Sequence, residues 1–289
     1  MKRREFIREA AIAAGAIALA PATGFMNVEA KAKYASDRIA LGKTGITVSR
    51  LAMGTGTSGF GSHSDQSESL GISGLADLLK AAHEHGINFW DSADVYGTHP
   101  HLRAALKLIS REKVVILTKT EASTKEEMQA DLDRFRKEIG TDYIDIVLLH
   151  MMTDSDWPTG KAGAMEVLSR ARESGIVRAH GVSCHTLRAL ETAASSSWVQ
   201  IDLARINPAG AIMDADASTV VHHLRRMHDD GKGVIGMKIF GSGQLVHRRD
   251  ECLRYVLSLP CVDAFTIGQR GQSEMLDLVK RIPDVSVAS

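Results

Sequence analysis

Four side chains of different chemistry follow three consecutive apolar stretches of the sequence. Asp91 ends one stretch and Tyr96 follows it by five residues, while Lys119 and His150 come at the ends of the next two stretches. A tyrosine hydroxyl has an ordinary pKa near ~10, and an adjacent ammonium group lowers that pKa because it stabilises the phenolate. Asp91 would keep Lys119 charged and in place, and a neutral His150 would donate to a carbonyl oxygen. Together the four residues suit the protonation of a carbonyl oxygen during its reduction.

Each of these residues also has an ordinary structural interpretation. A lysine at a strand end is commonly a surface group, a lone histidine is commonly a hydrogen-bonded core residue, and an Asp–Lys pair is commonly a structural ion pair. Because all of these residues fall at three neighbouring strand ends, a single functional site is favoured over the separate structural interpretations. Because no side chain can supply a hydride, the site implies a bound redox cofactor.

The elements that must position these residues form a repeating pattern. Eight short, unalternating apolar stretches are typical of strands buried on both faces of a parallel sheet, and amphipathic segments lie between them. One such segment begins with a capping box, Ser123 with Glu126, and ends at Gly140. The alternation predicts a (β/α)8 TIM barrel, in which functional groups gather at the carboxyl ends of the strands. The expected strands are Leu51–Thr55, Ile87–Asp91, Val114–Thr118, Ile144–His150, Ala179–Cys184, Ile201–Ile206, Val234–Ile239 and Ala264–Ile267.

An open doubly wound sheet is the alternative fold. The stretch Gly54–Gly59 fits G-x-G-x-x-G, but no helix follows at once and no acidic residue stands about 20 residues further on after a second strand. Before the first strand, Arg38–Leu41 and Ile46–Val48 flank Gly42-Lys43-Thr44-Gly45. This arrangement predicts an N-terminal β-hairpin that closes the bottom of the barrel.

The first 32 residues have the composition of an export signal. Arg3-Arg4 precede an apolar stretch over residues 10–20, and Ala30-Lys31-Ala32 offers a cleavage site. The arginine pair resembles the twin-arginine signal of bacteria. We therefore expect a signal peptide over residues 1–32 and one barrel domain over residues 33–289. Export by the twin-arginine (Tat) machinery to the periplasm, with a cytoplasmic cofactor loaded beforehand, follows from this reading; a soluble helix and an uncleaved anchor are the alternatives.

The amino-acid composition limits the classes of molecule with which the protein can be expected to interact. The 35 Lys+Arg and 35 Asp+Glu residues give a net charge of 0, which argues against nucleic acid because phosphate binding needs a basic face. No apolar run reaches the ~18–20 residues that span a bilayer. Three cysteines show no zinc spacing, adjacent histidines such as His222 and His223 are typical of exposed helices, and we expect no metal. Pairing of Cys252 with Cys261, the oligomeric state and the substrate stay open.

Two longer motifs resemble the aldo-keto reductase family. Residues 41–51 read L-G-K-T-G-I-T-V-S-R-L, similar to the family's L-G-x-T-G-x-x-V-S, and residues 86–97 read G-I-N-F-W-D-S-A-D-V-Y-G, similar to G-I-N-x-x-D-T-A-x-x-Y-G. The resemblance covers nearly all of residues 33–280. It implies an NADPH-dependent enzyme that reduces aldehydes or ketones to alcohols, with a small-molecule carbonyl substrate. The family's catalytic tetrad maps onto Asp91, Tyr96, Lys119 and His150, with Tyr96 as the general acid.

The resemblance also implies a cofactor site at the ends of the last four strands. Cys184 stands where the family has an amide-binding Asn, Leu203 and Ile206 replace a Gln and a Tyr, and Met237 occupies the position of a stacking aromatic residue. Arg270 resembles the residue that binds the adenosine 2′-phosphate, and Glu274 the one facing the adenine, so NADP is favoured over NAD. The expected cofactor-binding residues are Ser183, Cys184, Asn207, Met237, Lys238, Gly241, Gly243, Gly268, Arg270 and Glu274.

These departures from the family pattern leave a second function open. A cofactor-binding sensor, or a catalytically weak barrel acting on a partner protein, would also keep the fold. The scarcity of NADPH outside the cytoplasm favours this alternative, and the intact set of four catalytic residues opposes it.

Overall fold

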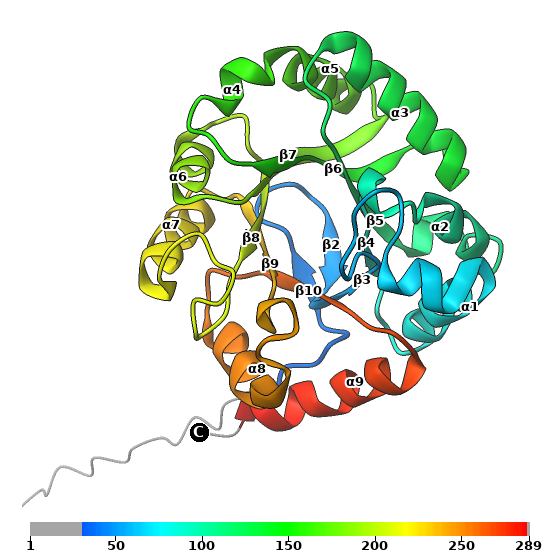
Figure 1. The fold of residues 1–289 in the computed structure, drawn as a ribbon, viewed down its shortest axis with the longest axis vertical. Coiled ribbons are helices and arrows are strands. Elements are labelled where there is room, and N and C mark those ends of the chain that lie inside the picture. Colours follow the sequence, from blue (N-terminus) through cyan, green and yellow to red (C-terminus); the bar gives the residue numbers. More distant parts are fainter. Residues whose placement is uncertain (1–30, 288–289) are drawn as a thin grey trace, which may run out of the picture. The chain divides into compact units, whose positions relative to one another are not determined.

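A computed structural model of the 289-residue chain describes residues 31–287. Eight parallel strands close into a barrel in the order β10-β3-β4-β5-β6-β7-β8-β9, and the helices form a ring outside it (Figure 1). The (β/α)8 barrel predicted from the sequence is therefore confirmed, and the open-sheet alternative is wrong. The strands are β3 (Leu51–Gly54), β4 (Phe89–Asp91), β5 (Val115–Thr120), β6 (Ile144–Met152), β7 (Val177–Cys184), β8 (Ile201–Arg205), β9 (Gly233–Met237) and β10 (Ala264–Gly268).

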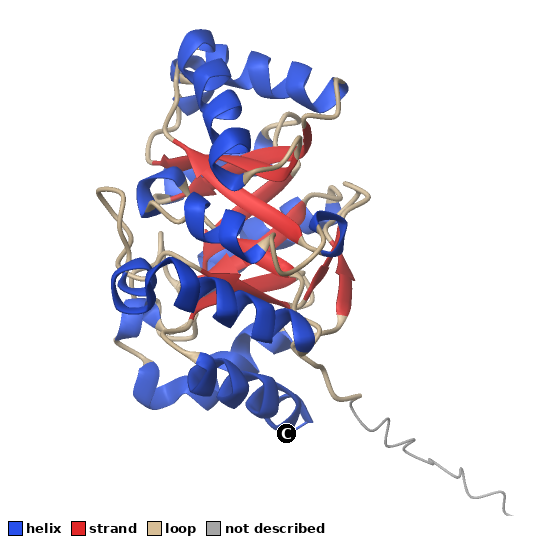
Figure 2. Cartoon of the chain, turned by 90° about the vertical axis from the view of Figure 1, so that its right-hand side faces the viewer, coloured by secondary structure: helices blue, strands red, loops and turns tan. Residues whose placement is uncertain are grey.

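Helices follow the strands along the chain and cover the outside of the barrel (Figure 2). A short 3₁₀ helix, η1 (Asp94–Tyr96), lies between β4 and the next α-helix, and a second one, η3 (Gly241–Gly243), follows β9. The α-helices are α1 (Asp65–Glu84), α2 (His99–Ala105), α3 (Lys125–Ile139), α4 (Trp157–Gly160), α5 (Ala162–Glu173), α6 (Leu187–Ser195), α7 (Ala217–Asp229), α8 (Arg249–Ser258) and α9 (Gln272–Val287).

The hairpin predicted before the first barrel strand is present as antiparallel strands β1 (Arg38–Ala40) and β2 (Thr47–Ser49). Leu41 and Ile46, from the turn between them, are buried in the same cluster as the side chains that fill the barrel. The backbone N–H of Lys43 donates to the carbonyl of Gly231, which directly precedes the loop into β9. The hairpin thus closes the amino-terminal end of the barrel, and β2 appears in the middle of the ring in Figure 1.

Side chains along each strand alternate between the barrel interior and the surrounding helices, and this alternation decides which residues point inward at the rim. Phe89, Leu117 and Leu148 fill the barrel interior, whereas Trp90 and Ile116 pack between the strands and the helices. Successive side chains of a strand point to opposite faces, so the residues two positions after the interior ones also point inward. These positions hold the carboxylate of β4, the lysine of β5 and the histidine of β6 at the carboxyl-terminal rim.

Helix α3 begins one residue later than the sequence suggested. The N-cap is Thr124, whose side chain accepts from the backbone N–H of Glu127, and Glu127 accepts in return from the N–H of Thr124. The expected box of Ser123 with Glu126 is wrong, because Glu127 also accepts from the N–H of Ser123 at 2.8 Å and so satisfies two free donors. The helix ends at Gly140 in a left-handed conformation, as predicted.

The predictions made for the amino-terminal segment lie outside the described residues. Arg3-Arg4 and the apolar stretch that follows belong to residues 1–30, and nothing in the structure tests them. Within residues 31–287, no helix combines the length and the apolarity that crossing a bilayer requires. Cys184, Cys252 and Cys261 are buried free thiols, so the pairing left open above does not form here.

Candidate active site

An ion pair between β4 and β5 is the centre of the rim. The Lys119 ammonium donates to Asp91 Oδ1 at 2.5 Å and to the carbonyl of Ser92 at 2.7 Å. The hydroxyl of Thr266, from β10, donates to the other oxygen, Asp91 Oδ2, at 2.8 Å. Burial alone would lower the pKa of Lys119, but the Asp91 carboxylate and Tyr96 more than offset it and the pKa is raised. Lys119 is therefore a fixed, permanently charged group.

Tyr96 lies beside this ion pair. The ammonium nitrogen of Lys119 is 4.9 Å from the centroid of the Tyr96 ring, and the His150 ring meets it edge-on at 5.9 Å between centroids. Burial raises the pKa of Tyr96, Asp91 raises it further, and Lys119 lowers it as expected from the sequence. Burial outweighs the lysine, so the pKa is raised overall and the phenol is protonated at neutral pH.

His150 is neutral. Burial is the largest cause that lowers its pKa to about 2, and the charges of Lys119 and Lys238 and the neighbouring His185 add to the effect. Its Nδ1 is buried without a hydrogen-bond partner among the described residues. A neutral imidazole offers one N–H donor, and the protonated phenol beside it offers one O–H donor. Two such donors directed at one oxygen are what polarisation of a carbonyl group needs.

The glycine-rich stretch after β3 packs against Tyr96. A β-carbon on Gly56 would come within 2.1 Å of the Tyr96 ring, and one on Gly59 within 2.4 Å. Gly97 is in the left-handed region at φ 62°. It lies so close to the loop between β3 and α1 that a β-carbon on Gly97 would be 2.0 Å from the carbonyl oxygen of Ser62. The G-x-G-x-x-G pattern therefore reflects a close approach of backbone to the tyrosine ring, not a dinucleotide-binding turn.

Three of the expected cofactor residues gather at the same rim. Ser183 is buried, and its hydroxyl oxygen accepts from the N–H of Met151 at 3.0 Å, which holds the turn after His150. Met237 belongs to the barrel-interior cluster and stays 9% exposed. Lys238, half-buried with φ 56°, follows it. Burial and then the charges of Arg205 and Lys119 lower the pKa of Lys238, so this corner is electropositive.

Two expected cofactor residues do not join this group. The side chain of Cys184 is fully buried in the cluster between barrel and helices, beside Asp202, because it occupies an outward position of β7. The Asn207 amide donates to the carbonyl of Ala211 at 2.8 Å and accepts from the N–H of Ala211 at 3.0 Å. Asn207 thus holds its own loop together.

The glycines that were expected to lie near phosphate groups instead make contacts within their own turns or with neighbouring side chains. The N–H of Gly241 donates to the Lys238 carbonyl at 2.8 Å, and that of Gly243 donates to the Phe240 carbonyl at 2.9 Å. A β-carbon on Gly268 would come within 2.0 Å of the Thr57 hydroxyl. These N–H groups are engaged within the turn after β9, so the glycines serve turn geometry and close packing in this structure.

Arg270 lies two residues before α9, and Glu274 lies in the first turn of that helix. Glu274 accepts from the backbone N–H of Arg270 at 2.8 Å, and the Arg270 side chain is exposed. Just before them, Gln269 is 1% exposed, and neither amide atom of its side chain has a partner among residues 31–287. A buried amide without partners and an exposed guanidinium suit a polar, phosphate-bearing ligand, so this side of the rim fits a nicotinamide dinucleotide.

Sequence reasoning missed Thr266 and Arg205. Both point into the barrel at its carboxyl-terminal rim, and Arg205 donates to Asp214 Oδ1 at 3.0 Å and to the His185 carbonyl at 2.5 Å. The rule that found the tetrad, reading polar residues at strand ends, would have found both if it had been applied to β8 and β10.

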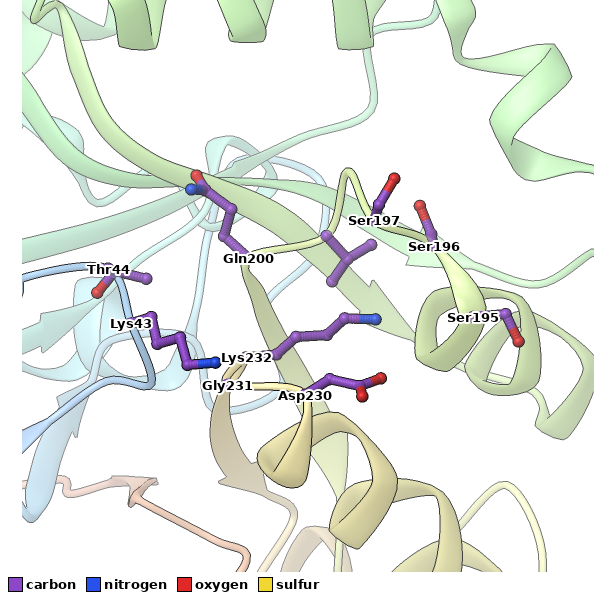
Figure 3. Close-up of a pocket in the computed structure, with 10 residues that line it drawn as sticks. Lys43, Thr44, Ser195, Ser196, Ser197, Gln200, Asp230, Gly231 and Lys232 are labelled. Atoms are coloured by element: carbon purple, nitrogen blue, oxygen red, sulfur yellow. The ribbon is translucent and has the colours of Figure 1, made fainter.

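A polar cleft of about 440 Å³ lies elsewhere, beside the hairpin (Figure 3). It is lined by the hairpin turn residue Lys43, by the end of α6 and by Asp230–Lys232 before β9. The Lys232 ammonium is already occupied, because it donates to the carbonyls of Ala193 and Ala194 at the end of α6. No tetrad residue borders this cleft, and a barrel of this kind carries its chemistry at the other end.

Comparison with known proteins supports the assignment of the fold. The chain is 30% identical over 175 residues to an NADH-specific methylglyoxal reductase of Escherichia coli, covering 50% of this chain and 51% of that protein. It is 23% identical over 214 residues to a D-threo-aldose 1-dehydrogenase of a Pseudomonas species, covering 62% of this chain and 64% of that one. The matches thus span about half to two thirds of the length of these relatives.

A solved structure of an aldo-keto reductase from Pseudomonas aeruginosa superposes with a TM-score of 0.70 at 22% identity. It covers 90% of this chain and 99% of the other, so the two share one fold. The model of the aldo/keto reductase family matches residues 52–279, which include all four tetrad residues and the whole rim from β3 to α9. With this match and the closed barrel, the chain belongs to the aldo/keto reductase family.

Proposed function

We propose that this protein is an NAD(P)H-dependent oxidoreductase that reduces an aldehyde or ketone to an alcohol. The observation that carries the proposal is the rim geometry: a protonated Tyr96 beside the Asp91–Lys119 ion pair and a neutral His150. Two relatives named as a reductase and a dehydrogenase support the same reaction class. A surface ion pair would not need a half-buried phenol and a buried imidazole around it.

Each residue has a separate part in the reaction. Tyr96 donates its proton to the carbonyl oxygen as negative charge develops there, and His150 orients that oxygen through its N–H. Lys119 stabilises the phenolate that remains, because its charge favours that form. Asp91, held by Thr266, fixes Lys119. Met237 would pack against the ring of a bound nicotinamide, and Lys238 would donate to an amide or phosphate oxygen of the cofactor. The chemistry that such a cofactor would supply is hydride transfer to the carbonyl carbon.

The experiment that tests the reaction is the Tyr96→Phe variant. The ring keeps its place against Gly56, and only the proton donor is lost. Single-turnover reduction of a reactive aldehyde should slow by ~10²–10⁴-fold, while nucleotide affinity measured by fluorescence stays the same. Wild-type turnover in this variant would show that Tyr96 is not the proton donor and would contradict the mechanism.

We further propose that NADPH is the preferred cofactor. The exposed guanidinium of Arg270 just before α9 supports this choice, because a guanidinium binds a phosphate through two parallel hydrogen bonds. The relative from Escherichia coli is named as NADH-specific, so the choice between the two nucleotides is a property of each protein and has to be measured for this one. The affinities for NADPH and NADH, measured before and after removal of the Arg270 side chain, test this choice.

Export through the twin-arginine route, with the mature protein in the periplasm, is also a proposal. It rests on Arg3-Arg4 and the apolar stretch that follows. Replacing both arginines with lysine keeps the charge and should leave folded protein in the cytoplasm. Unchanged periplasmic protein, measured by fractionation, would show that the pair does not direct export.

A cofactor-binding sensor is the second candidate function. The outward position of Cys184 and the occupied amide of Asn207 remove two of the cofactor contacts that the family resemblance implied. The assay that separates the two candidates is turnover. A sensor binds NADPH and reduces no aldehyde, whereas the proposed reductase does both.

A further inference from the structure

Helix α3 presents a stripe of charged side chains to the segments that carry the catalytic residues. Arg134 forms a two-pronged ion pair with Asp94: Nη1 donates to Oδ1 at 2.6 Å and Nη2 to Oδ2 at 2.9 Å. The same Nη2 donates to Asp131 Oδ1 at 2.7 Å, one turn earlier on α3. Asp94 is the first residue of the 3₁₀ helix η1, and Tyr96 is its last.

The same stripe also holds β5 on both sides of Lys119. Thr120 donates to Asp131, and Thr118 shares a 2.7 Å hydrogen bond with Nε2 of the buried His99. His99 Nδ1 donates to Glu138 Oε2 at 2.9 Å, at the end of α3. Thr118 and Thr120 point outward to α3 because Lys119, between them, points into the barrel.

Three of these residues have the spacing of a cation site. One ligand atom each from Asp94, His99 and Glu138 lies within 4.8 Å of the others. The guanidinium of Arg134 lies among them, donating to Asp94 and, at 3.4 Å, to Glu138 Oε1. His99 uses its second nitrogen on Thr118. Arg134 thus supplies a positive charge within the cluster, and the side chains of the cluster are hydrogen-bonded to one another.

The helix that carries Tyr96 needs an external anchor. It has three residues, no side-chain cap at its start, and a backbone bond from Gly97 to Asp94 that closes a single turn. A turn of this size does not hold its own orientation. On its inner side the ring rests on Gly56, and on its outer side Asp94 is tied to α3.

We propose that Arg134 is a positioning residue: through Asp94 it fixes the turn that carries Tyr96 at the distance from Lys119 that proton donation requires. The kinetic part of this inference rests on the proposed reductase function. Asp94 and Arg134 are 31% and 42% exposed, and ion pairs this exposed contribute little to overall stability. Their effect is therefore expected in the placement of the phenol, where an error of about 1 Å costs roughly a hundredfold in rate.

The test compares Arg134→Met with Arg136→Met. Arg136 lies on the same helix and pairs with Asp133 of that helix at 2.6 Å, so it is a matched control that does not touch η1. In Arg134→Met, kcat for a reactive aldehyde should fall roughly ten- to a hundredfold, with KM and nucleotide affinity nearly unchanged. Asp94→Asn should lose as much, and the double variant should lose no more than either single one. Arg134→Lys, which keeps the charge without the fork, should recover part of the rate.

A second readout does not depend on turnover. Burial raises the pKa of Tyr96, so a phenol released to solvent should titrate closer to its ordinary value. Ultraviolet difference titration, with Tyr96→Phe subtracted to remove the other tyrosines, should show a lower pKa in Arg134→Met than in Arg136→Met. Amide hydrogen exchange over residues 93–98 should be faster in the first variant.

The outcomes separate the two proposals. If the wild type reduces no aldehyde, the proposed function fails, and the titration and exchange measurements alone decide whether Arg134 positions Tyr96. Identical kcat, titration and exchange in Arg134→Met and Arg136→Met would overturn the inference, as would a lower melting temperature with none of these changes. If Arg134→Met does not fold, Asp94→Asn, which keeps its size, carries the same comparison.

Discussion

The ring of Tyr96 lies directly against the backbone of Gly56. A β-carbon at Gly56 would approach the ring to 2.1 Å, far inside van der Waals contact. The proposed general acid is thus held from one side by a residue whose only contribution is the absence of a side chain. Because the opposing atoms belong to a ring that is itself packed, the clash cannot be relieved by a small torsion of a flexible chain.

Gly56→Ala should therefore displace the phenol and lower kcat. A shift of about 1 Å predicts a loss of roughly a hundredfold, measured in steady-state reduction of an aldehyde. Gly160→Ala is the matched control, because a β-carbon there meets nothing within 4 Å. If Gly56→Ala kept the rate of Gly160→Ala, the ring would have freedom that the structure does not show.

The pH dependence of turnover should have one basic limb and no break from His150. His150 has a pKa of about 2, mainly because it is buried, so it stays neutral throughout the range in which the protein is assayed. Tyr96 must be protonated to act, and its pKa is raised above 10.0. The single-turnover rate should be flat near pH 6.5 and fall only as the pH rises past 10. A break near pH 6.5 that persists in His185→Gln would show that His150 titrates.

Arg270→Ala should weaken NADPH much more than NADH. Only NADPH carries the 2′-phosphate, and a charge-assisted contact of this kind contributes about 1.5–3 kcal/mol, or roughly ten- to a hundredfold in affinity. Fluorescence titrations with both nucleotides measure the difference. Arg249→Ala, which alters an exposed arginine paired with Asp277, is the control. Equal losses for both nucleotides in Arg270→Ala would place the arginine elsewhere in the site.

Asp202→Asn should stabilise the protein at neutral pH. Asp202 lies fully buried between the barrel and its helices, both carboxyl oxygens lack partners among the described residues, and burial raises its pKa from 3.8 to about 7. The folded state disfavours the charged form, so the wild type loses stability as the pH rises from 3.8 through 7. Three pKa units correspond to roughly 4 kcal/mol as an upper limit, and Asn escapes this cost.

Urea unfolding at pH 4.5 and pH 8 measures this effect. The advantage of Asp202→Asn should be small at the lower pH and largest at the higher one. The exposed Asp77→Asn, on α1, is the control and should show no such trend. An advantage that does not grow with pH would mean that the Asp202 carboxyl is already solvated or paired.

The tetrad could be predicted because strand polarity alone brings it together. In a closed parallel barrel every carboxyl end lies at one rim, so Asp91, Lys119 and His150 had to meet there once the strands were recognised. The orientation of Cys184 could not be read in the same way. Its strand is buried on both faces, so hydrophobicity does not show which face a residue takes, and only the register with β6 and β8 settles it.

Two further features could not be predicted, because they depend on contacts between segments that lie far apart in the sequence. The Gly54–Gly59 pattern is the same whether the backbone approaches a phosphate or an aromatic ring, and only the fold shows that the neighbour is Tyr96. The charged residues of α3 cannot be told from an ordinary solvated face in the sequence, because Asp94 and Thr118 reach them from segments far away in sequence. Such tertiary hydrogen bonds leave no periodic signature along the chain.

The hydrogen bond from Thr266 to Asp91 joins residues 175 positions apart, across the seam where the last strand meets the first. During synthesis and refolding, the Asp91 carboxylate therefore lacks the hydrogen bond from Thr266 until β10 docks and the ring of strands closes. Contacts this distant in sequence form slowly compared with helices. Recovery of activity after denaturation should consequently follow the slowest folding phase, well after helical signal returns, so enzymatic turnover is a direct reporter of seam closure.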